Sequence, residues 1–192
     1  MHIALTGGIG SGKSHVCRLL EDYNIDVYDC DAAAKRLIST SAGLQQELSR
    51  TVGSDLFRAG TLDKAALSRF IVSSEENVQK INSLVHPAVA SDFLSSGCEW
   101  LESAILFESG FYRRVDFDFV VCVIAPLETR IRRIMQRDSL TYDKALEWID
   151  RQMPQEEKAK KANFVIDNDG ESDLKKQIQR LLDIINKQFK SI

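Results

Sequence analysis

A glycine-rich loop near the start of the chain carries the residues whose types and spacing point most directly to chemistry. Residues 7–14 read GGIGSGKS, which follows the pattern G-x-x-x-x-G-K-S of phosphate-binding loops. Its glycines permit positive φ angles and leave room for a phosphate beside the main chain. The loop amides and the N-terminus of the next helix together favour an anion. The loop therefore predicts a site for a nucleoside triphosphate and its magnesium ion.

Single positions in this loop have distinct expected roles. Lys13 can reach the β- and γ-phosphates, and the Ser14 hydroxyl can join the coordination shell of magnesium. The residues expected to contact the nucleotide are Gly8, Ile9, Gly10, Ser11, Gly12, Lys13, Ser14 and His15. The alternative is a plain glycine turn, but the spacing, the Lys-Ser pair and the flanking strand and helix all agree with a phosphate loop.

Two acidic residues follow the second apolar segment. Residues 25–28 favour a short strand, and Asp29 and Asp31 come directly after it. Ligands of an open parallel sheet bind beyond the carboxyl ends of the strands, so both carboxylates are expected near the γ-phosphate. One could accept the proton of an attacking hydroxyl, and one could order magnesium. The alternative is a helix N-cap pair, because Asp is favoured there with or without chemistry.

Further charged residues are candidates for contacts with phosphate or substrate. Glu108 follows residues 100–107, an apolar run expected to form a strand, so it could serve magnesium, contact substrate or simply end the strand. Arg130, Arg133 and Arg137 share one predicted helix face. Arginine suits the phosphate oxygens of a transition state, and Arg137 is the favoured clamp, with a solvated basic face as the alternative.

The order of elements predicts an α/β fold with a five-stranded parallel sheet, because helical segments alternate with apolar, β-rich ones. The expected strands are residues 2–6, 25–28, 100–107, 117–125 and 164–167. Residues 40–97 interrupt this alternation and are expected to be all-helical, with an N-cap at Asp63, a capping box from Ser73 to Glu76 and a helix start at Pro87. We expect a nucleotide-binding core, residues 1–39 and 98–192, a helical insertion, 40–97, and a helical lid at about 126–162.

Composition narrows the functional classes. The 192 residues are 44% hydrophobic and 28% charged, as in ordinary globular proteins. The net charge of −3 argues against nucleic-acid binding by bulk charge. The four cysteines form no C-x-x-C pair and predict neither zinc nor a redox motif. No signal peptide precedes the first strand, and the longest apolar run is too short for a bilayer, so we expect a cytoplasmic protein without membrane or nucleic-acid partners.

The ordered set of motifs resembles the dephospho-CoA kinase family over essentially the whole chain. The segments that carry the resemblance are residues 5–14, 29–31 (DCD), 84–87 (LVHP), 105–108 (ILFE), 136–138 (QRD) and 165–170 (VIDNDG). The resemblance implies a sheet of the P-loop kinase type. It also implies transfer of the γ-phosphate of ATP, with Mg2+, to the ribose 3′-hydroxyl of dephospho-CoA, the last step of coenzyme A synthesis.

The resemblance also implies roles for single residues. Asp31 becomes the base, and residues 40–97 become the acceptor-binding domain, with His86 on the acceptor side. A lone His in such a helical segment is otherwise more often structural. The turn that holds Asn168 and Gly170 is implied to lie against the adenine of ATP. Three positions depart from the family pattern, namely His15, Cys30 and Ala104, and of these His15 could alter the contact with the α-phosphate.

Two other functions compete with this interpretation. A small-molecule kinase like shikimate kinase has a similar loop and an acidic pair after the second strand, but the long helical insertion with His86-Pro87 disfavours it. A nucleotide-dependent regulatory switch would need segments that sense the γ-phosphate. If it used GTP, it would also need the tetrapeptide N-K-x-D, which does not occur in the sequence.

Overall fold

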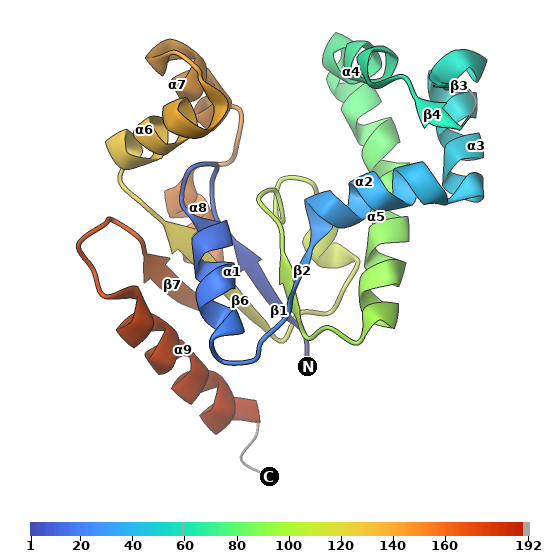
Figure 1. Ribbon diagram of the computed structural model, residues 1–192. Helices are drawn as coiled ribbons and strands as arrows, with labels where there is room; N and C mark the ends of the chain where they lie inside the picture. The colour runs from blue at the N-terminus through green and yellow to red at the C-terminus, as the bar shows by residue number, and fades with distance from the viewer. Residues whose placement is uncertain (59, 190–192) are drawn as a thin grey trace. The chain divides into compact units, whose positions relative to one another are not determined.

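A sheet of five strands organises the computed structural model, which describes residues 1–58 and 60–189 (Figure 1). The strand order is β2-β5-β1-β6-β7, and β1 pairs in parallel with both β5 and β6, as β6 does with β7. The strands are β1 (Ile3–Thr6), β2 (Val27–Asp29), β5 (Trp100–Glu102), β6 (Phe119–Ile124) and β7 (Phe164–Asp167). All four residues of β1 are buried, as expected of a central strand that is covered on both faces. The predicted five-stranded parallel sheet is confirmed.

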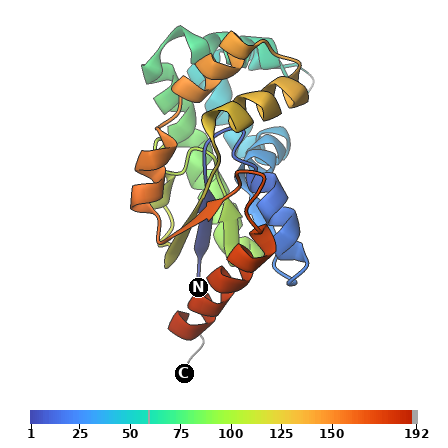
Figure 2. The ribbon, with the colours of Figure 1, turned by 90° about the vertical axis from the view of Figure 1, so that its left-hand side faces the viewer.

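The described chain divides into two compact units, Met1–Tyr28 with Cys98–Ile192, and Asp29–Gly97. In the first unit, α1 and α9 cover one face of the sheet, and α8 lies against β6 on the other face (Figures 1 and 2). The helices of this unit are α1 (Lys13–Glu21), η2 (Phe111–Arg113), α6 (Leu127–Asp138), α7 (Tyr142–Asp150), α8 (Gln155–Lys161) and α9 (Leu174–Phe189).

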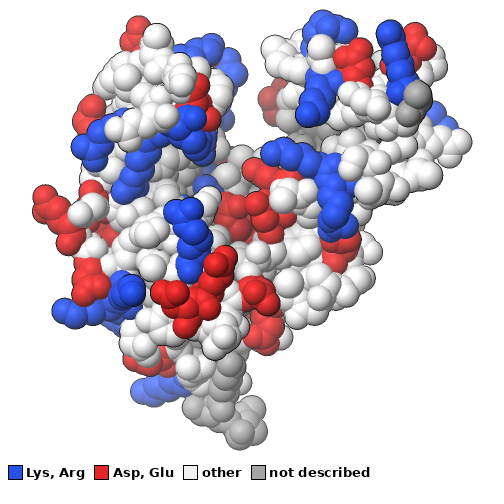
Figure 3. Space-filling model, viewed as in Figure 1, with Lys and Arg blue, Asp and Glu red and all other residues white. Residues whose placement is uncertain are grey.

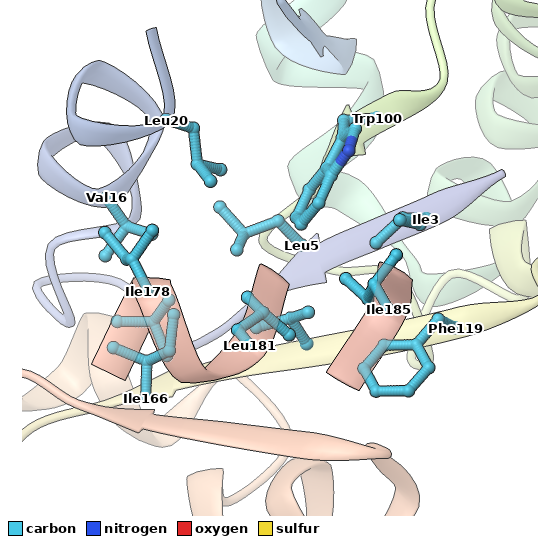
Figure 4. Packing of buried hydrophobic residues seen from close by; sticks show 12 residues of the cluster. Ile3, Leu5, Val16, Leu20, Trp100, Phe119, Ile166, Ile178, Leu181 and Ile185 are labelled. Carbon is cyan, nitrogen blue, oxygen red and sulfur yellow. The ribbon is translucent and has the colours of Figure 1, made fainter. Parts of the chain in front are cut away.

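A hydrophobic core fixes α1 and α9 on the sheet (Figure 4). Val16 and Leu20 of α1 and Ile178, Leu181 and Ile185 of α9 are buried against side chains from the strands. The spacing of these residues produces one apolar stripe on each helix. Burying each such side chain contributes about 1.5–3 kcal/mol. The glycine loop connects β1 to α1. The packing of α1 on β1 therefore also fixes both ends of the loop.

The second unit is built around one long helix. It consists of α2 (Cys30–Thr40), α3 (Ala42–Val52), η1 (Ser54–Leu56), β3 (Phe57–Arg58), β4 (Thr61–Leu62), α4 (Lys64–Ser73) and α5 (Glu75–Ser96). The helices α2, α3 and α4 each pack against α5. The unit includes α2, whereas the boundary expected from sequence lay near residue 40.

The second unit departs from the sequence prediction in containing two strands. Phe57 pairs with Leu62 and Arg58 with Thr61 in a short antiparallel hairpin, so the expectation of helices alone was wrong. Gly60, with a φ of 78°, supplies the left-handed backbone of the turn. Two-residue strands are too short for periodicity to reveal.

The start of α5 also differs from the predicted capping box. Asp63 caps α4 as predicted, since its carboxylate accepts a hydrogen bond from Ala66 N at 2.9 Å. At α5, however, the N-cap is Ser74, whose Oγ accepts from Asn77 N at 3.2 Å. Ser73 is the last residue of α4. The capping box was therefore predicted one residue too early.

Pro87 lies inside α5, so the prediction that it begins a helix was wrong. A proline in a helix interior removes one backbone hydrogen bond. Buried apolar residues on both sides of it, including Val85 and Val89, continue the face of α5 that packs in the unit. This packing outweighs the lost hydrogen bond, and α5 continues through Pro87 to its end at Ser96, a helix of 22 residues in all. No helix in the described part of the chain is both long enough and apolar enough to cross a membrane.

Candidate nucleotide site

The glycine loop leads from β1 directly into the N-terminus of α1. Ser11 N donates to Gly8 O at 3.1 Å and closes a tight turn. Gly10 and Gly12 have φ angles of 79° and 91°, which side-chain-bearing residues rarely adopt. Gly12 is the N-cap position of α1, and its carbonyl accepts the first helical bonds, from His15 N and Val16 N. The loop therefore presents backbone donors at the positive end of a helix dipole, as predicted for anion binding.

Lys13 reaches back over this loop. Its Nζ lies 3.5 Å from Gly8 O and 3.5 Å from Oε1 of Glu102. The side chains of Lys13 and Glu102 are only 10% and 15% exposed. Both contacts are at the long limit of a hydrogen bond, so a phosphate oxygen can compete for the ammonium group.

Glu102 is a site residue that the sequence interpretation missed. The predicted strand at residues 100–107 ends at Glu102, because residues 104–109 fold into turns in which Ser109 N donates to Ile105 O. Since Leu5 is in register with Glu102, the carboxylate lies beside the end of β1, next to the start of the loop. The acid at the carboxyl end of this strand is therefore Glu102, and the expectation of Glu108 there was wrong. A signal was present in the sequence, since the polar pair Glu102-Ser103 interrupts the apolar run.

Glu108 instead ties its turn to α8. Its Oε1 lies 2.6 Å from Nζ of Lys158 and accepts from Met153 N at 3.1 Å. The Lys158 side chain is 0% exposed, and its Nζ also donates to Ala104 O at 2.7 Å. Burial lowers the pKa of Lys158, and the neighbouring Glu108 opposes this by favouring the charged form. The geometry gives Glu108 a structural partner, while its predicted contact with substrate remains a prediction.

The arginines of α6 do not form one uniform face. Arg130 is buried, and its Nε donates to Ile9 O at 2.9 Å. Arg133 Nη1 lies 3.4 Å from Gly10 O and 3.2 Å from Ser11 O. Burial lowers the pKa of both guanidinium groups. These two arginines therefore hold the loop, and for them the alternative of a solvated face is wrong.

Arg137 behaves differently from the two arginines before it. Its guanidinium forms a close pair with the carboxylate of Asp138, including a 2.7 Å contact from Nη2, and its side chain is 61% exposed. The structure shows basic side chains gathered over the part of the molecule that carries α6 and α7 (Figure 3). The role of Arg137 as a phosphate clamp stays a prediction.

Two segments distant in sequence also reach the loop. Asn168, which follows β7 and is buried, donates from Nδ2 to Ser11 O at 2.8 Å. Gln152, between α7 and α8, accepts from Ile9 N at 2.7 Å. Sequence reasoning missed Gln152, since no motif marks it. Gly170, the other residue expected at adenine, is exposed and has a φ of 102°.

The remaining predicted site residues belong to the second unit. Asp29 is the N-cap of α2, and its Oδ1 accepts from Ala32 N at 2.9 Å. Helix capping was the alternative that the sequence left open beside a magnesium role for Asp29. Asp31 is exposed in the first turn of α2. His86 is half-buried on α5. The catalytic, metal and acceptor roles of these three residues remain predictions.

The residues at the loop fit a nucleotide with magnesium. Within the described residues, no group of three or more His, Cys, Asp and Glu side chains forms a closed metal site. Ser14 and Glu102 provide oxygen donors, which Mg2+ prefers, and magnesium usually completes its shell with water and substrate phosphates. Among the described residues, the buried hydroxyl oxygens Thr6 Oγ1, at the end of β1, and Ser11 Oγ, in the loop, have no hydrogen-bond partner. Such hydroxyls at a loop are suited to a polar ligand.

Comparisons with known proteins find similar sequences and structures that cover most of the chain. The family model described as dephospho-CoA kinase matches residues 1–173. A protein named dephospho-CoA kinase from Bacteroides fragilis (strain YCH46) is 41% identical over 187 residues, covering 94% of this chain and 90% of that protein. The crystal structure of TT1252 from Thermus thermophilus is 33% identical, with a TM-score of 0.79, and covers 98% of this chain and 99% of that one.

The rival kinase type is similar in fold only. A shikimate kinase from Acinetobacter baumannii, solved in complex with shikimate, is 16% identical, with a TM-score of 0.55 over 98% of this chain and 94% of that one. The family match and the relatives with higher identity decide between the two. This chain belongs to the dephospho-CoA kinase family.

Proposed function

We propose that this protein transfers the γ-phosphate of ATP to the ribose 3′-hydroxyl of dephospho-CoA, giving coenzyme A and ADP. The observation that carries the proposal is the phosphate loop with Lys13 held over it, in a chain that the family model matches over residues 1–173. Catalysis of phosphoryl transfer depends mainly on positioning the reactants and stabilising the charge of the transition state. The loop amides, the N-terminus of α1 and the Lys13 ammonium are groups of the kind required.

Lys13 is assigned to the β- and γ-phosphates. Charge shifts on the oxygens of the transferred group as the reaction proceeds, and a fixed ammonium stabilises it. Its present partners, Gly8 O and Glu102, keep the side chain folded over the loop rather than extended into solvent. The cation is thus pre-positioned before the nucleotide arrives, which reduces the entropy lost on binding.

Ser14 and Glu102 are the residues that would hold magnesium. When bound, the ion neutralises negative charge on the phosphates. In phosphate-loop enzymes the loop hydroxyl and an acid at the end of a neighbouring strand share this task. We favour Glu102 over Asp29 for the acid, because the Asp29 carboxylate already accepts the capping hydrogen bond of α2.

The acceptor side of the proposal is assigned to the second unit. Asp31, in the first turn of α2, is the proposed base for the 3′-hydroxyl, and His86 is proposed to contact the acceptor. Asp31 is exposed, so its carboxylate can take up a proton from a bound substrate. Arg137 is proposed to exchange its contact with Asp138 for phosphate oxygens of the transition state.

A turnover assay with a panel of acceptors tests this function. Purified protein is given Mg2+ and ATP with dephospho-CoA, with shikimate, or without acceptor, and both ADP and the phosphorylated product are measured. We expect ADP and coenzyme A in equal amounts with dephospho-CoA alone. Turnover of shikimate would favour the rival kinase, and slow ADP release without acceptor would favour a switch. Lys13→Ala should abolish the reaction, whereas Arg132→Ala, on the exposed side of α6, should leave it unchanged.

A further inference from the structure

The outer side of the phosphate loop is held by side chains from two separate parts of the chain. Three successive carbonyl groups, those of Ile9, Gly10 and Ser11, all accept hydrogen bonds from them. The donors are Arg130 Nε at 2.9 Å from Ile9 O, Arg133 Nη1 at 3.4 and 3.2 Å from Gly10 O and Ser11 O, and Asn168 Nδ2 at 2.8 Å from Ser11 O. We call Arg130, Arg133 and Asn168 the carbonyl bracket.

The bracket is itself connected. Arg133 Nη2 donates to Asn168 O at 3.0 Å and lies 3.3 Å from its Oδ1. Asn168 N in turn donates to Ile124 O, which anchors this residue on the sheet. Arg130 and Asn168 are each 5% exposed. Buried polar groups that bond one another in this way have little freedom to move.

Holding these carbonyls decides where the loop amides point. In a planar trans peptide the C=O and the N–H point in opposite directions. When the carbonyls of Ile9 and Ser11 turn toward the bracket, the N–H groups of Gly10 and Gly12 turn to the other side. Glycine-rich backbone without such partners would sample many orientations, including ones that aim a carbonyl oxygen at a phosphate.

The glycines and the bracket also fit each other sterically. A Cβ on Gly12 would lie 2.0 Å from Asn168 Nδ2, and one on Gly8 would lie 2.4 Å from a terminal nitrogen of Arg130. A Cβ on Gly10 would lie 2.7 Å from the backbone oxygen of Arg130. The loop therefore needs glycine at these positions because the bracket stands against them, as well as to leave room for a ligand.

We propose that Arg130, Arg133 and Asn168 are positioning residues that pre-organise the loop, fixing the Gly10 and Gly12 amides toward the polyphosphate before a nucleotide binds. The inference rests on the proposed function for the identity of the ligand. It assigns Asn168 to phosphate recognition through the loop, instead of to the adenine. It also separates Arg130 and Arg133, which act on the loop backbone, from Arg137, the proposed phosphate clamp.

Asn168→Ala tests this most cleanly, because it removes a hydrogen bond without changing charge. The probes are inorganic tripolyphosphate with Mg2+, which has phosphates but no adenine, and the ratio of the dissociation constants of ATP and GTP. We expect the variant to bind tripolyphosphate on the order of tenfold more weakly, the effect of one lost hydrogen bond. The ATP to GTP ratio should stay unchanged. Unchanged tripolyphosphate binding with a reduced preference for ATP would overturn the inference and return Asn168 to the adenine.

Three further variants and one direct readout complete the test. Arg133→Met should also weaken tripolyphosphate binding, Arg133→Lys should restore part of it, and the exposed Arg132→Met should match the wild type. Amide hydrogen exchange of residues 8–13 should be faster in Asn168→Ala, with the exchange of the sheet unchanged. Equal exchange and equal binding in the wild type and both bracket variants would refute the bracket alone. If the wild type formed no coenzyme A from dephospho-CoA and ATP, the proposed function would fail instead. If Asn168→Ala does not fold, Asn168→Ser and the Arg133 pair provide the same comparison.

Discussion

Lys13 Nζ lies 3.5 Å from Oε1 of Glu102, which joins the first residue of α1 to the last residue of β5. The two residues are 89 positions apart in the sequence and meet because β5 is the direct neighbour of β1 in the sheet. The pairing places a negatively charged and a positively charged side chain beside the same loop. The contact therefore defines the acidic side of the candidate phosphate site.

Glu102→Gln is expected to weaken the response to magnesium. Loss of a group that supports the coordination shell of a metal from just outside it typically costs 10–100-fold in metal affinity or activity. The magnesium concentration for half-maximal activity should rise by about that factor, with the fold retained, as judged by thermal unfolding. Glu99→Gln, an exposed change just before β5, is the matched control. An unchanged magnesium requirement would make Glu102 only a partner of Lys13.

Asp31→Asn is expected to reduce kcat while leaving the dissociation constants of ATP and dephospho-CoA nearly unchanged. Help from a general base is worth roughly 10²–10⁴ in rate, and the isosteric amide preserves positioning. Rapid-quench turnover and equilibrium binding measure the two effects separately. Wild-type turnover would reduce Asp31 to a residue of the first helical turn.

Asp29→Asn provides the contrast to that change. Asn is as good an N-cap as Asp, so a residue that only caps α2 should tolerate the substitution in both stability and kcat. Unfolding in urea and steady-state kinetics would check this. A higher magnesium requirement in Asp29→Asn would instead return the metal role to Asp29.

Arg137→Ala is expected to lower kcat by about 10²-fold, the usual loss for a group that stabilises developing charge. Binding of ATP in the ground state should change much less, because an interaction made only in the transition state does not contribute to it. Stability should change little, since the pair with Asp138 is a surface pair. If kcat is retained, the clamp must be sought elsewhere.

Glu108→Gln is expected to destabilise the protein by about 3 kcal/mol, because it leaves the buried Lys158 ammonium without its carboxylate partner. Urea unfolding measures the change, and Glu157→Gln on the exposed side of α8 is the control. A variant of normal stability whose KM for dephospho-CoA has risen would favour the substrate contact that the sequence predicted for Glu108.

Local patterns in the sequence determined much of the fold. The phosphate loop, the five strands and the N-cap at Asp63 could be predicted because each depends on residues close together in the chain. Errors occurred where signals competed. The apolar side chains at 104–107 resembled a strand although they form turns, and Pro87 resembled a helix start although packing carries α5 through it.

The tertiary structure alone decided which side chains complete the loop. Glu102, Gln152 and Asn168 meet residues 8–13 through contacts between distant segments, and no spacing rule connects them. Arg130, Arg133 and Arg137 share a helix spacing, yet two of them hold the loop and one pairs with Asp138. The sequence determined which groups could bind a phosphate. The packing of α6 and of the β7 end against the loop decided how they are used, because a hydrogen bond depends on position and direction that only the folded chain supplies.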